Sequence, residues 1–287
     1  MSYATLPALI ALYGACYVPF AALSKIAGGR HGPSGILLGS VLSSAIVWAI
    51  VCTTLGWWGR VKRGLTGASL LAGLASVAIL VASVVMYGEP RLSVVLPALL
   101  TKGGVLLLSP AIDRWKRRPV RPAHVATLAL AALAVVVGFA PHMGAESSAV
   151  ALVCAAVYLL GYGLKLPAME SGKRERGLDF LCAEMTVTSL TAVALCLPLL
   201  RISGHAAAGL ADPVVLLSGV VSCGCGFFGG LMLLYRDTCT RLVPLSKAVG
   251  LIAGVIASVC LGKVPGVPEI AGVALMTGAL WLGTREA

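Results

Sequence analysis

Residues 92–111 read LSVVLPALLTKGGVLLLSPA, an apolar stretch with Lys102 close to its middle. About 20 apolar residues are enough to cross a bilayer as a helix, so this stretch predicts a transmembrane helix. A lysine at membrane depth is costly unless its ammonium group finds a partner, which makes Lys102 a candidate site residue. The stretch 242–261, LVPLSKAVGLIAGVIASVCL, again has a proline, then Lys247, then a glycine. We expect the two stretches to be matching members of an internal repeat that face one central pathway.

The composition of the whole chain excludes an ordinary soluble domain. Of the 287 residues, 59% are hydrophobic and only 11% are charged, and the mean hydropathy is +0.96. Apolar runs recur along the whole chain, and no charged block or linker is long enough to mark a second domain. We therefore predict a single all-α integral membrane domain over residues 1–287.

The charge and the cysteines exclude several other classes of protein. The formal net charge is +11, but Lys and Arg lie almost entirely in the connections between apolar runs, so nucleic-acid binding is not expected. The nine cysteines lack the CxxC or Cys/His spacing of a zinc site, and no metal is expected. Without a P-loop, a Ser/His/Asp arrangement or paired carboxylates, we expect neither a cofactor nor enzymatic activity. The first apolar run has no basic residue before it and no clear cleavage site, which predicts a retained helix.

Ten apolar runs are long enough to be transmembrane segments, and helices suit them because backbone groups in lipid must be hydrogen-bonded internally. The predicted helices are 6–24, 36–57, 68–87, 92–111, 123–140, 147–164, 180–200, 213–235, 242–261 and 269–283.

Basic residues divide unequally between the two sides of these helices. Connections on one side hold fourteen Lys and Arg residues, and connections on the other side hold five. The positive-inside rule then predicts an inner (plasma) membrane protein with both termini in the cytoplasm. Trp57, Trp58, Trp115 and Trp281 fall near helix ends on the cytoplasmic side, as interfacial aromatic residues do. The basic run 114–122, RWKRRPVRP, fits this topological role, with attraction of an anionic lipid or substrate as the alternative.

The first five and the last five predicted helices show weak internal similarity. Tyr17 is followed by Lys25 at the end of the first helix, as Tyr158 is followed by Lys165 at the end of the sixth. YGE follows the third helix and YRD follows the eighth. Because each half has an odd number of helices, the second half must be inserted upside down, which predicts inverted repeats with a substrate site between them. The predicted halves are residues 1–141 and 142–287.

These features resemble the drug/metabolite transporter superfamily, and within it the ten-helix EamA-like transporters. The resemblance covers essentially the whole chain and rests on the helix count, the two halves and the segment 242–283, which looks like the family's closing helix pair. In that segment Lys263 follows Gly262 where the family has a glutamate, and Glu269 lies further downstream. The resemblance implies a transporter with alternating access to a central cavity.

The two lysines within predicted helices leave alternatives open. Lys102 lies about ten residues into its helix and so roughly 15 Å deep. It either pairs with a buried acid or helix carbonyls, or lines a polar cavity and attracts an anion. Lys247 lies about six residues from the cytoplasmic start of its helix, so snorkelling to the interface is an alternative for its ammonium group. A pathway with two lysines favours phosphate, carboxylate or sulfate, because an anion offsets their desolvation.

Glu184 is the acid predicted inside a helix, about one turn from the cytoplasmic end. Its role is either an ion pair with Lys165 or Lys247, or a proton relay. The first predicted helix has no glutamate, although small cation exporters of the superfamily need one there. This argues against proton-coupled export of cationic drugs.

Four tyrosines form two i, i+4 pairs that each share one helix face: Tyr13 with Tyr17, and Tyr158 with Tyr162. They either flank the cavity and bind substrate, or serve packing and interfacial anchoring. Prolines 19, 97, 110 and 244 within or beside helices permit bends. The glycine pattern at 224, 226 and 229 has no preceding strand and does not indicate nucleotide binding, and the GxxxG at 250 and 254 predicts close helix packing.

The sequence therefore predicts an inner-membrane secondary transporter that moves a small, anionic organic metabolite by alternating access. The alternative is a flippase for a phospholipid or a polyprenyl-phosphate-linked lipid. Expected partners are the substrate and membrane lipids, and the protein is expected to be a monomer or a homodimer. The predicted substrate-binding residues are Lys102, Lys247, Tyr13, Tyr17, Tyr158, Tyr162 and Glu184.

Overall fold

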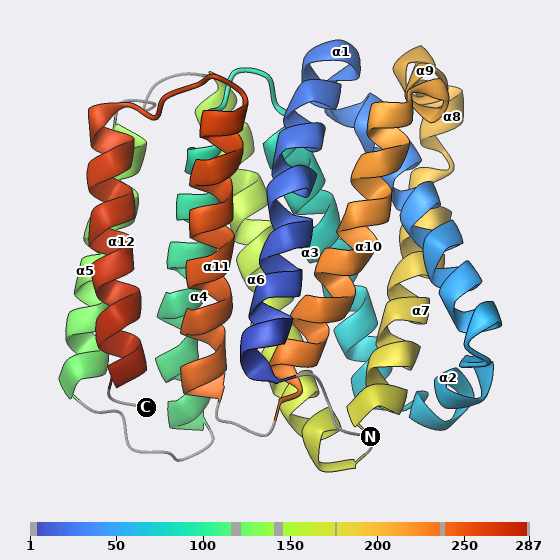
Figure 1. The fold of residues 1–287 in the computed structure, drawn as a ribbon, viewed down its shortest axis with the longest axis horizontal. Coiled ribbons are helices and arrows are strands. Elements are labelled where there is room, and N and C mark those ends of the chain that lie inside the picture. Colours follow the sequence, from blue (N-terminus) through green and yellow to red (C-terminus); the bar gives the residue numbers. More distant parts are fainter. Residues whose placement is uncertain (1–4, 116–121, 141–145, 176, 236–238, 286–287) are drawn as a thin grey trace.

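All regular secondary structure in the described part of the chain is helical. The computed structural model describes residues 5–115, 122–140, 146–175, 177–235 and 239–285. Its helices stand side by side in one bundle (Figure 1). The predicted all-α class is confirmed for these residues.

Six of the described helices are long and apolar enough to cross a membrane, as expected of a membrane protein, and shorter apolar segments lie within α4, α5 and α12. The helices are α1 (Leu6–Thr54), α2 (Trp58–Gly64), α3 (Gly67–Gly88), α4 (Val95–Trp115), α5 (Pro122–Phe139), α6 (Glu146–Glu175), α7 (Gly177–Cys196), α8 (Leu199–Ile202), α9 (Gly204–Ala211), α10 (Pro213–Leu233), α11 (Cys239–Cys260) and α12 (Val267–Arg285).

Helix α1 consists of two arms that reverse direction at Gly32. The connection predicted between residues 24 and 36 is much shorter than expected, because helical turns continue through it and only Gly32 leaves the helical conformation (φ 68°, ψ 175°). Glycine adopts a positive φ without steric cost, and Pro33 behind it suits the first turn of the returning arm. Figure 1 shows the chain rising through the first arm (6–31) and descending through the second arm (33–54).

Helices α6 and α7 extend beyond their predicted boundaries for one physical reason. Hydropathy marks where the apolar run ends, whereas a helix continues through polar residues on either side of the membrane. Helix α6 extends to Glu175, so Lys165 lies inside the helix and not at its end as predicted. Helix α7 begins at Gly177, so Glu184 is two turns from its start rather than one. The short helices α2, α8 and α9 occupy predicted connections.

Helices of the two predicted halves pack mainly against each other. Helix α1 contacts α10 and α11, α3 contacts α6 and α7, α4 contacts α11, and α5 contacts α12. Glycines permit the closest of these approaches: a Cβ on Gly219 of α10 would lie 1.9 Å from Ser43 Oγ of α1. Outside the described residues lie the boundary between the halves at 141–142, the basic residues counted at 116–118, 121, 176 and 236, and part of the YRD segment.

A polar cluster ties the turn of α1 to the start of α10. Asp212 caps α10 by accepting a hydrogen bond from the Val214 amide at 2.8 Å, and its other oxygen accepts from His31 at 2.8 Å and Arg30 at 3.2 Å. Burial alone would raise the pKa of Asp212, but the bonds from His31, the Val214 amide and Arg30 outweigh it and hold this pKa below its ordinary value. The cluster thus fixes the reversal of α1 against α10.

Candidate functional site

The bundle contains a cavity of about 140 Å³, measured as the space open to the centres of water molecules. This is room for several waters, since one needs only about 10–15 Å³ on that measure. The lining comes from α1, α3, α4, α6, α7, α10 and α11, which belong to both predicted halves. Six of the seven predicted site residues line it: Tyr13, Tyr17, Lys102, Tyr158, Tyr162 and Glu184.

Lys102 holds its ammonium group at the cavity wall between two tyrosines. The side chain is only 1% exposed, and its Nζ donates to the hydroxyls of Tyr17 at 2.8 Å and Tyr158 at 3.2 Å. Within the described residues no carboxylate forms an ion pair with Lys102. An ammonium group has three donors, and these bonds use two. The neutral hydroxyls accept hydrogen bonds from the ammonium group of Lys102 but provide no negative charge to balance it.

The absence of a side chain at Gly250 creates the space for Lys102. A Cβ on Gly250 of α11 would lie 2.7 Å from Cε and 3.3 Å from Nζ of Lys102. One helical turn further, a Cβ on Gly254 would lie 3.1 Å from Ala98 Cβ of α4. The GxxxG pattern therefore lies at the contact of α4 and α11, and its first glycine leaves room for the side chain of Lys102.

Lys247 lies on α11 beside the other tyrosine pair. It is 1% exposed, and its Nζ lies 3.6 Å from the ring centroid of Tyr162 and 5.9 Å from that of Tyr158. Such cation–π contacts contribute about 0.5–2 kcal/mol. Lys102 Nζ is 5.5 Å from the same Tyr158 centroid. The two lysines thus flank one tyrosine, and the ammonium group of Lys247 is buried against aromatic rings.

Glu184 forms an ion pair with Lys165 in a three-residue cluster at the cavity. Lys165 Nζ lies 2.6 Å from Glu184 Oε1 and donates to Ser76 Oγ at 2.8 Å, while Ser76 donates to Glu184 Oε1 at 2.7 Å. The three residues belong to α3, α6 and α7. Lys165 and Ser76 were not among the predicted site residues. A hydroxyl residue inside the apolar run of α3 was the available signal for Ser76.

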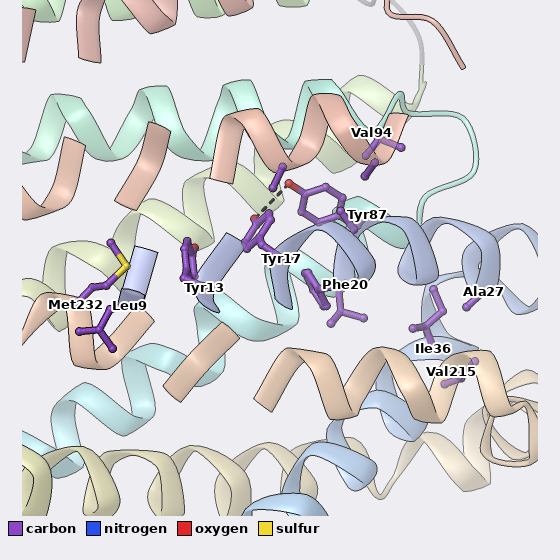
Figure 2. Close-up of a cluster of buried hydrophobic side chains, with 14 residues drawn as sticks. Leu9, Tyr13, Tyr17, Phe20, Ala27, Ile36, Tyr87, Val94, Val215 and Met232 are labelled. Carbon is purple, nitrogen blue, oxygen red and sulfur yellow. Dashed lines mark hydrogen bonds between the residues drawn. The ribbon is translucent and has the colours of Figure 1, made fainter. Parts of the chain in front are cut away.

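The tyrosine pairs form aromatic walls on α1 and α6. Ring centroids are 5.5 Å apart for Tyr13 and Tyr17, and 4.9 Å apart for Tyr158 and Tyr162. Figure 2 shows Tyr13 and Tyr17 along α1, with the hydroxyl of Tyr17 directed to that of Tyr87 on α3, 3.3 Å away. Tyr87 extends the hydrogen-bond chain that begins at Lys102, a link that sequence reasoning missed.

The structure also shows what Lys25 and the glycines of the GxGxxG pattern contact. Lys25, the expected counterpart of Lys165, donates to the backbone carbonyls of Glu89 and Leu92 instead of to an acid. The GxGxxG glycines of α10 accommodate side chains, and a Cβ on Gly229 would lie 3.1 Å from the Tyr13 ring. Pro110, whose bend was predicted, lies among residues whose side chains are not described.

Comparisons with known proteins establish the fold and no more. No family model and no curated protein matches the chain, whereas twelve chains of solved structures do. One of them, described as "Crystal structure of protein", has a TM-score of 0.63 and 17% sequence identity, over 97% of this chain and 97% of its own. The arrangement of helices is therefore shared with a solved structure over nearly the whole length.

Proposed function

We propose that the protein is a multi-pass secondary transporter for a small organic anion, with Lys102 as the principal binding group. The observation that carries this proposal is a buried ammonium group at the wall of a cavity, held by two neutral tyrosine hydroxyls. Burying a charge without a counter-charge costs several kcal/mol, so such a group is retained where a ligand supplies the opposite charge.

The charges around Lys102 favour an anion over a cation. Lys102 and Lys165 line the cavity and Lys247 lies behind its tyrosines, whereas Glu184 is the one acid among the lining residues described. Glu184 already neutralises Lys165. An entering phosphate, carboxylate or sulfate offsets the desolvation of the other two lysines, whereas a cation increases the repulsion.

We assign ten helical segments of the bundle as membrane crossings. They are the two arms of α1 together with α3, α4, α5, α6, α7, α10, α11 and α12. In Figure 1, α1 begins and α12 ends on the same side of the bundle, where α2 also lies, while α8 and α9 lie on the opposite side. This arrangement supports an even number of crossings, with both termini and the basic helix α2 in the cytoplasm.

The packing supports two inverted halves related by pseudo-symmetry. Counterparts are five segments apart, so the first arm of α1 is the counterpart of α6, and α4 is the counterpart of α11. The contact of α4 with α6 therefore corresponds to the contact of α11 with the first arm of α1. A Cβ on Gly104 of α4 would meet Leu159 of α6. In the corresponding contact, a Cβ on Gly14 of α1 would meet Val249 of α11. Between the halves lies the cavity, as in transporters built from inverted repeats.

The resemblance to EamA-like transporters of the drug/metabolite transporter superfamily supports alternating access as the mechanism. The chain has no ATPase motif, so transport takes its energy from an ion gradient, from exchange or from the gradient of the substrate. We place the protein in the inner membrane.

Purified protein in proteoliposomes tests this function. Vesicles that contain unlabelled sulfate, succinate or a sugar phosphate are given the same labelled compound outside, and exchange is compared for the wild type and Lys102→Met. The expected result is exchange of at least one anion, with loss in the variant. A fluorescent anionic phospholipid in the same vesicles tests the flippase alternative, and lipid scrambling without anion exchange contradicts the proposal.

A further inference from the structure

We infer that Glu184 is a proton-binding site that couples anion transport to proton movement, and that Lys165 is the cation whose availability it controls. This inference rests on the proposed anion transport and specifies its coupling ion. It is carried by the geometry of the Ser76, Lys165 and Glu184 cluster at the cavity.

The two oxygens of the Glu184 carboxylate have different surroundings. Oε1 accepts from Ser76 at 2.7 Å and pairs with Lys165 at 2.6 Å. Oε2 is buried and accepts no hydrogen bond from any described residue. A buried carboxylate oxygen without a donor is costly as an anion, and a proton bound there removes the charge. Glu184 lines the cavity, which has room for water molecules that could carry that proton.

The other ionisable groups near Glu184 are mostly basic or weakly acidic. The nearest on α6 are Lys165 and Tyr162. The ring of Tyr162 makes a cation–π contact with Lys247 of α11. Across the cavity are Lys102 of α4 and the cysteines of α10, and α3 contributes hydroxyls only. Arg60 and Arg63 of α2 are held by Asp179 at the start of α7. Groups lining the cavity or close to Glu184 are Tyr13, Tyr17, Cys52, Lys102, Tyr158, Tyr162, Lys165, Cys182, Cys223, Cys225 and Lys247.

Proton binding at Oε2 changes what the cavity offers to an anion. An O–H bond forms, the carboxyl becomes neutral, and the ammonium group of Lys165 loses its counter-charge while it keeps the bond to Ser76. The cavity gains one unit of positive charge, and an anion now pairs with Lys165. When the proton leaves, the Glu184 carboxylate competes with the anion for Lys165 and promotes its release. By linkage, proton and anion each raise the affinity for the other.

Proton uptake during anion binding tests the inference. The purified protein is titrated in weakly buffered detergent solution with sulfate, which does not buffer near neutral pH, and a pH indicator reports protons. The wild type is expected to take up about one proton per bound anion, because binding favours the protonated carboxyl. Glu184→Gln is expected to bind the anion without proton uptake, and Glu89→Gln, outside the cavity, to behave as the wild type.

Equal proton uptake by the wild type and Glu184→Gln overturns the inference, as does anion binding by the wild type with no proton uptake. Infrared spectra decide the case in which sulfate does not bind: the protonated-carboxyl absorption of the acidified wild type is expected to contain a component that is missing from Glu184→Gln. Failure of anion binding then contradicts the proposed function, whereas absence of that component contradicts proton binding at Glu184. If Glu184→Gln does not fold, Glu184→Gln/Lys165→Met replaces it, with Lys102 left to bind the anion. This variant is expected to show no proton uptake and no Glu184 infrared component.

Discussion

Two buried lysines at the same cavity are stabilised in opposite ways. Lys165 has a carboxylate at 2.6 Å and a serine hydroxyl at 2.8 Å. Lys102 has two tyrosine hydroxyls at 2.8 and 3.2 Å, and no acid of the described residues pairs with it. Glu184 therefore neutralises Lys165, whereas Lys102 has no counter-charge among the described residues. Under the proposed function, this difference separates a regulated cation from a binding cation.

The largest expected effect on transport comes from removal of the Lys102 ammonium group, whose charge is available to a ligand. Lys102→Met should lower anion exchange by about 100-fold, because a charge-assisted bond to a ligand contributes about 1.5–3 kcal/mol. Initial rates of exchange in proteoliposomes measure this loss. Lys62→Met, on the exposed face of α2, is the matched control and should exchange at the wild-type rate. Similar rates in the two variants would exclude Lys102 as the binding group.

Removal of the paired lysine should instead affect stability. Lys165→Met leaves the Glu184 carboxylate buried beside an apolar side chain and should cost about 3–5 kcal/mol of unfolding free energy. Glu184→Gln/Lys165→Met should recover most of that cost, because neither charge then remains. Unfolding of the single and double variants in detergent, followed by fluorescence, measures this. Additive losses in the double variant would show that the two residues do not stabilise each other.

A methyl group at Gly250 should displace the ammonium group of Lys102 without unfolding the protein. The Cβ of Gly250→Ala would lie 2.7 Å from Lys102 Cε, at the mobile end of a long side chain. We expect anion affinity to fall by about tenfold, corresponding to about 1.4 kcal/mol, with little change in unfolding. Gly278→Ala on α12 is the control, since nothing lies within 4 Å of its Cβ. Unchanged affinity in Gly250→Ala would mean that Lys102 binds equally well when displaced.

The hydroxyl chain beyond Lys102 should have a graded effect. Tyr17→Phe removes a direct acceptor of Lys102 and should weaken anion binding by several-fold to tenfold, whereas Tyr87→Phe removes only the partner of Tyr17 and should cost less. Equilibrium binding of the exchanged anion to each variant measures the order. A larger loss of anion affinity in Tyr87→Phe than in Tyr17→Phe would contradict a hydrogen-bond chain that runs from Lys102 through Tyr17 to Tyr87.

The smallest effect is expected at the ion pair outside the cavity. The lowered pKa of Asp212 means that its carboxylate stabilises the fold at neutral pH. That contribution is present above the unfolded-state pKa and is lost as pH falls through the folded-state pKa. Asp212→Asn should therefore unfold at a lower temperature than the wild type at neutral pH, with the difference vanishing in acid. A difference that does not depend on pH would assign the effect to helix capping alone.

Hydropathy predicted apolar helices, and six of the described helices are long and apolar enough to cross a membrane. The lysine, tyrosine and glutamate positions within the apolar runs predicted six of the residues that line the cavity. An apolar run carries its own signal for a helix, and a lysine inside that run indicates a site. The reversal at Gly32 was not predictable in detail, because one residue with positive φ replaces the expected loop. Lys165 was placed at a helix end, since the apolar run stops there although α6 continues. Ser76 had a sequence signal, a hydroxyl residue inside an apolar run, but its partners and those of Tyr87 became identifiable when α3 was placed against α6, α7 and α1.

The most direct test of anion binding by Lys102 is a structure of the protein with an exchanged anion bound. The anionic group is expected within hydrogen-bond distance of Lys102 Nζ, where it takes the ammonium donor that Tyr17 and Tyr158 leave unused. An anion bound elsewhere in the protein, with Lys102 still held only by the two tyrosines, would contradict its role in transport.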